Sequence, residues 1–134
     1  MRRLATVILG TLAIAACSAA DQATAPDASM AGTYQLKTMA GSTLPYIVLQ
    51  QPGLDLKVTA ESMTLDAAGA FTDITSYLRI NNGVVDYPVD TLVGTWSAYQ
   101  SNVTLVAKGQ KFGGTVVGNT LTLSDGVLVS VYTR

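Results

Sequence analysis

The sequence predicts an all-β protein, an antiparallel up-and-down meander of eight or nine strands that closes into a small barrel. Three observations support this fold class. Apolar and polar residues alternate with a period of two over most of the chain beyond residue 31, which is the pattern of a half-buried strand. Turn residues separate these runs at short intervals. The chain also contains 17 Thr and 14 Val, and both residue types fit a pleated sheet.

The expected strands follow one another with short connections. The alternating runs cover residues 32–38, 46–49, 54–65, 71–80, 84–99, 103–106, 112–117, 120–123 and 127–132. Asn82-Gly83 is a hairpin signal, because this pair adopts positive φ at low cost. The run 84–99 is too long for one typical strand, and Pro88 indicates an edge or an irregular segment within it. Gly94 indicates a bend.

The run 71–80 carries an ambiguity of parity. Ile74, Leu78 and Ile80 share one face of the expected strand, whereas Phe71 has the opposite parity. A β-bulge near Thr72 would return Phe71 to the same face as the other three.

Short connections force neighbouring strands to pair in antiparallel fashion. A meander of this length leaves two unpaired edges unless the sheet curls and closes. A barrel of about eight strands removes both edges, and its interior can be filled by side chains or can hold one small ligand.

Composition excludes several classes of function. Histidine is absent, which removes the commonest general base and the commonest transition-metal ligand. The single cysteine forms no disulfide within the chain and no zinc–thiolate cluster. The formal net charge is −1, and no Lys/Arg cluster occurs beyond residue 3, so nucleic acid is a poor candidate partner. We expect neither a metal nor a cofactor.

The first sixteen residues have the layout of a secretory signal. Met1-Arg2-Arg3 is a positive start, and an uncharged, mostly apolar run follows over 4–14. This run is shorter than the ~20 residues of a transmembrane helix. Ile14-Ala15-Ala16-Cys17 resembles the lipobox of bacterial lipoproteins, which implies cleavage before Cys17 and attachment of a lipid to its thiol. The alternative is an ordinary signal peptide with a cysteine near its cleavage site.

The expected organisation therefore has three parts. Residues 1–16 are a cleaved signal peptide, residues 17–31 are the lipidated cysteine with a flexible tether, and residues 32–134 are the barrel domain. The tether has little apolar surface to offset the entropy of ordering it. Ser18 is not the Asp of the inner-membrane retention signal, which favours the outer membrane in an organism that has one. We expect an exported protein that is anchored in the cell envelope through its lipid.

Short motifs in the barrel segment resemble the lipocalin-like domains of bacterial lipoproteins, which have a calycin-type β-barrel. They are Gly32-Thr33-Tyr34-Gln35-Leu36, Leu44-Pro45, Gly118-Asn119-Thr120-Leu121-Thr122-Leu123 and Val131-Tyr132-Thr133-Arg134. In lipocalins an aromatic residue of the first strand packs under a late arginine and closes one end of the barrel. The resemblance implies that role for Tyr34 beneath Arg134. It departs from the family at Ala68-Gly69-Ala70-Phe71, where an Asp-Gly-Thr-Phe is common.

Four aromatic residues in the middle of the meander are the candidate ligand-binding residues: Tyr77, Tyr87, Trp96 and Tyr99. Trp and Tyr combine an apolar body with a polar group, and near an open barrel mouth they could line a pocket. The alternative is core packing, since a domain of this size needs its large side chains to fill the interior.

Carboxylates are the other candidates. Asp66, Asp73, Asp86 and Asp90 could converge for general acid–base chemistry, although solvated strand-edge aspartates are the simpler reading. Asp86 and Asp90 share strand parity around Pro88, and oxygen ligands suit Ca²⁺, but the segment matches no known calcium loop. Neither pattern leads us to assign a catalytic or metal-binding residue.

The sequence thus favours a membrane-anchored lipoprotein whose barrel binds a small apolar or amphipathic molecule without catalysis. The alternative is a barrel with a filled interior that docks on another envelope protein. A small hydrolase is a third reading, which would need carboxylates that converge in a cleft. The expected partners are the membrane, through the covalent lipid, and either a small apolar ligand or an envelope protein.

Overall fold

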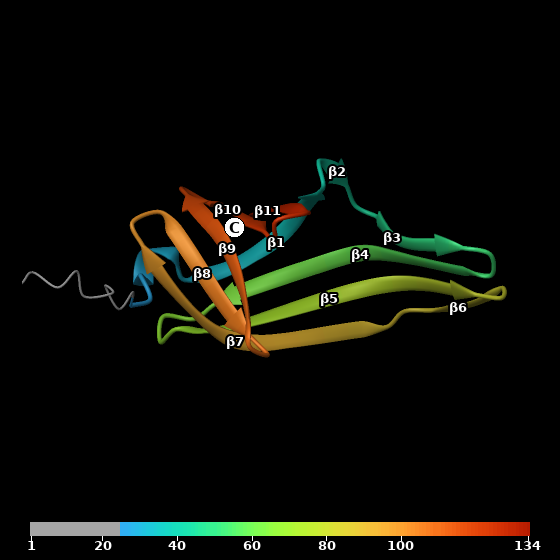
Figure 1. Ribbon diagram of the computed structural model, residues 1–134, viewed down its shortest axis with the longest axis horizontal. Coiled ribbons are helices and arrows are strands. Elements are labelled where there is room, and N and C mark those ends of the chain that lie inside the picture. The colour runs from blue at the N-terminus through green and yellow to red at the C-terminus, as the bar shows by residue number, and fades with distance from the viewer. Residues whose placement is uncertain (1–24) are drawn as a thin grey trace, which may run out of the picture.

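The computed structural model describes residues 25–134, which form a closed antiparallel β-barrel of eight strands (Figure 1). Neighbours around the barrel largely follow chain order, which confirms the predicted meander. The barrel strands are β1 (Gly32–Met39), β4 (Leu54–Leu65), β5 (Ala70–Asn81), β7 (Val89–Tyr99), β8 (Asn102–Ala107), β9 (Gln110–Val117), β10 (Thr120–Ser124) and β11 (Val129–Thr133). Outside the ring lie η1 (Ala28–Met30), β2 (Ser42–Thr43), β3 (Tyr46–Gln51) and β6 (Val84–Asp86).

Strand β1 closes the ring, because it pairs with both the last strand and an early one. It pairs with β11 through Leu36 and Tyr132, and with β4 through Tyr34 and Met63. Closure leaves no unpaired ladder within the ring, which removes the exposed edges that an open meander would carry.

The hairpin of β4 and β5 is longer than the barrel and extends beyond one end of it (Figure 1). β3 pairs with the start of β4, and β6 pairs with the end of β5, so a small sheet projects there. We call this projection, made of β3, residues 54–58, residues 77–81 and β6, the arm. Pro88 divides the predicted run 84–99 into β6 and β7, consistent with its missing N–H donor.

The parity of β5 differs from the sequence prediction. The pairing of β5 with β4 shifts between Val58 and Ala60, and no shift occurs near Thr72. Phe71 is buried, whereas Ile74 is 42% exposed and faces outward. The predicted bulge near Thr72 is therefore wrong. The barrel interior accepts polar side chains at some positions, so the face with more apolar residues is not always the inner one.

The core extends from Val58, in the arm, to the end of the barrel opposite the arm. Its largest fully buried side chains are Tyr34, Phe71, Leu65, Leu105, Leu121 and Val103. The chain enters the fold before residue 32: Met30 is 8% exposed, and the N–H of Ala98 donates to the carbonyl of Ala25 at 3.1 Å. Residues 25–31, which the sequence suggested as part of a tether, thus pack against this end of the barrel.

Candidate functional site

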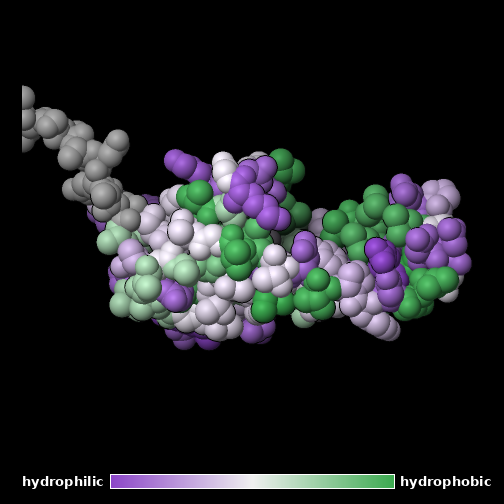
Figure 2. All heavy atoms as spheres, turned by 90° about the horizontal axis from the view of Figure 1, so that it is seen from below, coloured by the Kyte–Doolittle hydropathy of each residue, from purple (hydrophilic) through white to green (hydrophobic). Residues whose placement is uncertain are grey.

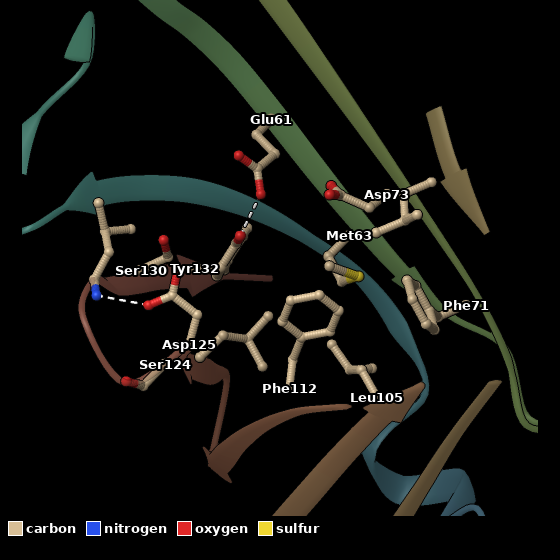
Figure 3. Close-up of a pocket in the computed structure, with 13 residues that line it drawn as sticks. Glu61, Met63, Phe71, Asp73, Leu105, Phe112, Ser124, Asp125, Ser130 and Tyr132 are labelled. Carbon is tan, nitrogen blue, oxygen red and sulfur yellow. Dashed lines mark hydrogen bonds between the residues drawn. The ribbon is translucent and has the colours of Figure 1, made fainter. Parts of the chain in front are cut away.

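A cavity of about 170 Å³, partly open to solvent, lies within the barrel (Figure 3). Seven of its side chains are apolar: Met63, Phe71, Leu92, Leu105, Phe112, Leu123 and Leu128. The remaining six are polar: Glu61, Asp73, Ser124, Asp125, Ser130 and Tyr132. Strands β4, β5, β7, β8, β9, β10 and β11 all contribute, so the site depends on the closed barrel and not on any one hairpin.

The apolar wall follows from the period of two along each strand. Opposite residues in paired strands point to the same face, so Leu105 of β8 and Phe112 of β9 enter the interior together. The same rule brings Leu92 of β7 into the barrel beside Asp73 of β5. These pairs place apolar surface around the cavity from several directions.

Two glycines leave room for the large side chains of this wall. A Cβ at Gly94 would stand 2.5 Å from the Phe71 ring and 2.1 Å from the Val106 carbonyl oxygen. A Cβ at Gly114 would stand 2.6 Å from a methyl group of Leu123. Each position therefore requires glycine, because a side chain there would overlap its neighbours. Gly94 leaves the space that the Phe71 ring occupies, and Gly114 leaves the space that Leu123 occupies.

The polar side of the cavity centres on Glu61. This residue is only 8% exposed, and its carboxylate accepts a hydrogen bond from the Tyr132 phenol of β11. Burial raises the pKa of Glu61, and the bond from Tyr132 opposes that rise. The phenol itself is buried beside a carboxylate, so the pKa of Tyr132 is also raised.

Asp73 is the second inward carboxyl. Burial raises its pKa to about 7, with further contributions from the charges of Glu61 and Asp90. One oxygen, Oδ1, is buried and has no hydrogen-bond partner. Such a group is costly in the charged form unless something satisfies it.

Asp125 also borders the cavity, but its carboxylate has a structural role. Its Oδ1 accepts from the N–H groups of Val127 and Leu128 at 2.9 and 2.7 Å. These bonds lower the pKa of Asp125 and hold the loop between β10 and β11. That loop places Leu128 against the cavity.

The opposite end of the barrel is covered by Tyr34 and Arg134. The guanidinium carbon of Arg134 lies 5.2 Å from the centroid of the Tyr34 ring, within the range of a cation–π contact. Arg134 also donates to the carbonyls of Ala31 and Ser29, at 2.6 and 2.8 Å. The Tyr34 hydroxyl donates to the Met30 carbonyl at 2.7 Å. The structure thus brings together the two residues that the resemblance paired.

The four aromatic candidates do not come together. Trp96 is 3% exposed, and its indole N–H donates to the Asp66 carbonyl at 2.7 Å, away from the cavity. Tyr87 and Tyr99 are 73% and 49% exposed. Tyr77 lines an open groove along the arm. None of the four lines the cavity. Tyr77 lies on β5, Trp96 and Tyr99 lie on β7, and Tyr87 lies in the connection between β6 and β7.

The four candidate aspartates separate into three settings. Asp86 forms an exposed ion pair with Arg79 on the arm, and Asp66 accepts from the Ala68 N–H in a turn. Asp73 lies on β5 and Asp90 on the paired strand β7, and the charge of Asp90 contributes to the raised pKa of Asp73. Within residues 25–134, no group of three or more His, Cys, Asp or Glu could hold a metal ion.

Sequence reasoning missed most of the cavity residues. Glu61 stands in an otherwise alternating run, and its position in phase with Met63 and Leu65 is the signal that could have placed it inside. Asp73 and Phe71 likewise share parity, but the three apolar residues of opposite parity, Ile74, Leu78 and Ile80, favoured the other face as the inner one.

Comparisons with known proteins do not assign a family. No family model matches the chain, and searches of curated proteins and of solved structures find no match. Among residues 25–134, no helix is long and apolar enough to cross a bilayer. Cys17 lies outside the described residues. The fold and the cavity therefore define the class: an eight-stranded antiparallel barrel with an internal, partly acidic cavity.

Proposed function

We propose that this protein binds a small apolar or amphipathic molecule inside its barrel and performs no chemistry on it. The cavity carries this proposal, because seven apolar side chains surround a space that the core leaves open. A space of about 170 Å³ is close to the ~150 Å³ that accommodates benzene in an engineered protein cavity. The ligand is therefore a compact molecule, or one end of a longer one.

Binding to the cavity can be tested by calorimetric titration of the purified protein with benzyl alcohol. The matched pair of variants is Leu92→Trp, which fills the cavity, and Val93→Trp, which alters the neighbouring position that is 63% exposed. We expect saturable binding near one to one, lost in Leu92→Trp and kept in Val93→Trp. Equal binding by both variants, or none by the native protein, would remove the proposal.

The chain is also proposed to be an exported lipoprotein, anchored in the cell envelope through Cys17. The support is the order of features in the sequence: positive start, apolar run, small residues and cysteine. Cells fed a labelled fatty acid should incorporate the label into the protein and place it in a membrane fraction, the outer membrane where one exists. Cys17→Ser should lose the label, whereas Ser18→Ala should keep it.

A second candidate function is docking on another envelope protein, and the arm favours it. Several large apolar side chains are exposed there, including Val84 (68%), Val85 (49%) and Ile47 (47%), and Figure 2 shows apolar surface gathered on the projecting end. Exposed apolar patches of this kind often mark interaction sites. A photo-crosslinker at Val84 should form one discrete adduct with an envelope protein, and the equally exposed Val117 on the barrel (69%) should form none.

A further inference from the structure

The acidic side of the cavity lacks a positive partner. Glu61 and Asp73 come from adjacent strands, and Figure 3 shows both carboxylates at one side of the pocket. Within residues 25–134 one ion pair occurs, between Arg79 and Asp86 on the arm. Glu61 has the Tyr132 phenol as its donor, and Asp73 Oδ1 has none.

Two carboxyls in such a place are costly for folding, because burial disfavours their charged forms and their charges repel. Apolar side chains at these positions would fill the interior at lower cost. A bound cation would offset both effects at once, since it supplies the missing charge and a donor for Asp73 Oδ1.

A metal ion is a poor match for this space. Calcium takes six to eight oxygen ligands, whereas most of the lining is hydrocarbon. An anion is repelled by the same two carboxyls. A molecule with an ammonium group and a short hydrocarbon body matches both sides of the cavity.

We propose that the ligand is a small amine, whose ammonium group lies between Glu61 and Asp73 while its hydrocarbon part packs against Met63, Phe71 and Phe112. This proposal rests on the proposed function, because it names the chemistry of the ligand that the same cavity would take. The part of the ligand that lies within the cavity would be about the size of a benzene ring.

The ionisation of the site supports a dependence on pH. The groups that face Asp73 or lie near it are Glu61 on β4, Tyr77 on β5, Asp90 on β7 and Tyr132 on β11, with Asp125 across the cavity. All of these are acids, so none supplies a competing positive charge. The pKa of Asp73 is about 7, so an ammonium ion that favours the carboxylate should bind more tightly at pH 8 than at pH 5.

The test compares three ligands of matched shape: benzylamine, benzyl alcohol and benzoate, each titrated calorimetrically into the purified protein at pH 8. We expect benzylamine to bind at least tenfold more tightly than benzyl alcohol, and benzoate to bind more weakly than either. At pH 5 the preference for the amine should shrink several-fold. Benzyl alcohol binding as tightly as benzylamine at pH 8 would overturn the amine proposal and leave the binding function standing. No binding of any of the three would overturn both.

Variants then identify the residues that cause the preference for benzylamine over benzyl alcohol. Asp73→Asn should reduce the benzylamine-to-benzyl alcohol affinity ratio to within about threefold of one, and Glu61→Gln should reduce it as well. Asp55→Asn makes the same change of charge on the arm, outside the cavity, and should keep the native ratio. Circular dichroism at each pH verifies that the variants fold. An unchanged ratio in folded Asp73→Asn and Glu61→Gln would show that the carboxyls do not hold the amine.

Discussion

The guanidinium of Arg134 lies over the ring of Tyr34, with 5.2 Å between the guanidinium carbon and the ring centroid. The contact joins the end of the chain to the first strand of the barrel. The pairing of β1 with β11 also closes the ring, so Arg134 stabilises this closure at the end of the barrel opposite the arm. Its two bonds to the carbonyls of Ser29 and Ala31 tie the segment before β1 to the same point.

Replacing Arg134 should therefore destabilise the barrel. We expect Arg134→Ala to lower the free energy of unfolding by about 1–3 kcal/mol, from the loss of the cation–π contact and of two charge-assisted hydrogen bonds. Urea unfolding followed by Trp96 fluorescence measures the change. Arg134→Lys keeps the charge but not the planar guanidinium, so its free energy of unfolding should lie between those of the native protein and Arg134→Ala. A melting temperature that stays the same in Arg134→Ala would show that the contact does not stabilise the fold.

Glycine positions give a second prediction with a matched control. A Cβ at Gly94 would stand 2.1 Å from the Val106 carbonyl oxygen, whereas a Cβ at Gly113 meets nothing within 4 Å. Gly94→Ala should cost about 2 kcal/mol or more, because the Phe71 ring and the backbone must both shift. Gly113→Ala should stay within about 0.5 kcal/mol of the native protein. Thermal unfolding of both variants decides this, and equal stability of the two would contradict the packing described around Phe71.

The fold was predictable because the signals for it are local. Alternation along each run and turn residues such as Asn82-Gly83 act over a few positions, and short connections then leave antiparallel pairing as the simple outcome. The arm was not predictable in this way. The arm forms because β4 and β5 extend beyond the strands beside them. How far they extend depends on their register with strands distant in the sequence, such as the pairing of Tyr34 with Met63.

The cavity was harder to predict than the fold, and Asp73 shows why. A rule that places apolar residues inside assigns Ile74 to the core, yet Ile74 faces solvent and Asp73 faces the cavity. A binding site needs polar groups at a few inner positions, so it departs from the pattern that predicts the strands. Trp96 shows the opposite error. Its residue type suggested a ligand pocket, but its side chain packs in the core and its indole N–H donates to the Asp66 carbonyl.

The bond between Tyr132 and Glu61 gives a third prediction. Tyr132→Phe removes the donor from a buried carboxylate, so we expect a loss of about 1–3 kcal/mol at pH 8. The loss should shrink in acid, because a protonated Glu61 no longer needs a donor to its charge. Tyr99→Phe, at a position that is 49% exposed, is the control and should leave stability nearly unchanged. Urea titrations at pH 8 and pH 4 give the comparison, and a loss that does not vary with pH would argue against an ionised Glu61 in the native protein.

The titration of Asp73 gives the last prediction. The pKa of Asp73 is about 7 in the folded protein and about 3.9 in an unfolded chain. Between these values the folded state binds more protons than the unfolded state, so stability falls as pH rises through this window and levels off above it.

Asp73→Asn removes the group that titrates, so it should flatten this part of the profile of stability against pH. At pH 8 the variant should be more stable than the native protein by roughly 1–3 kcal/mol, a range that allows for partial solvent screening. Near pH 4 the two should agree, because the native carboxyl is then protonated. Unfolding free energies at half-unit steps from pH 4 to pH 8, without added amine, measure both curves. Parallel curves would mean that the carboxyl of Asp73 titrates in the folded protein as it does in solvent, and that the inner side of the barrel is wetter at this position than its burial implies.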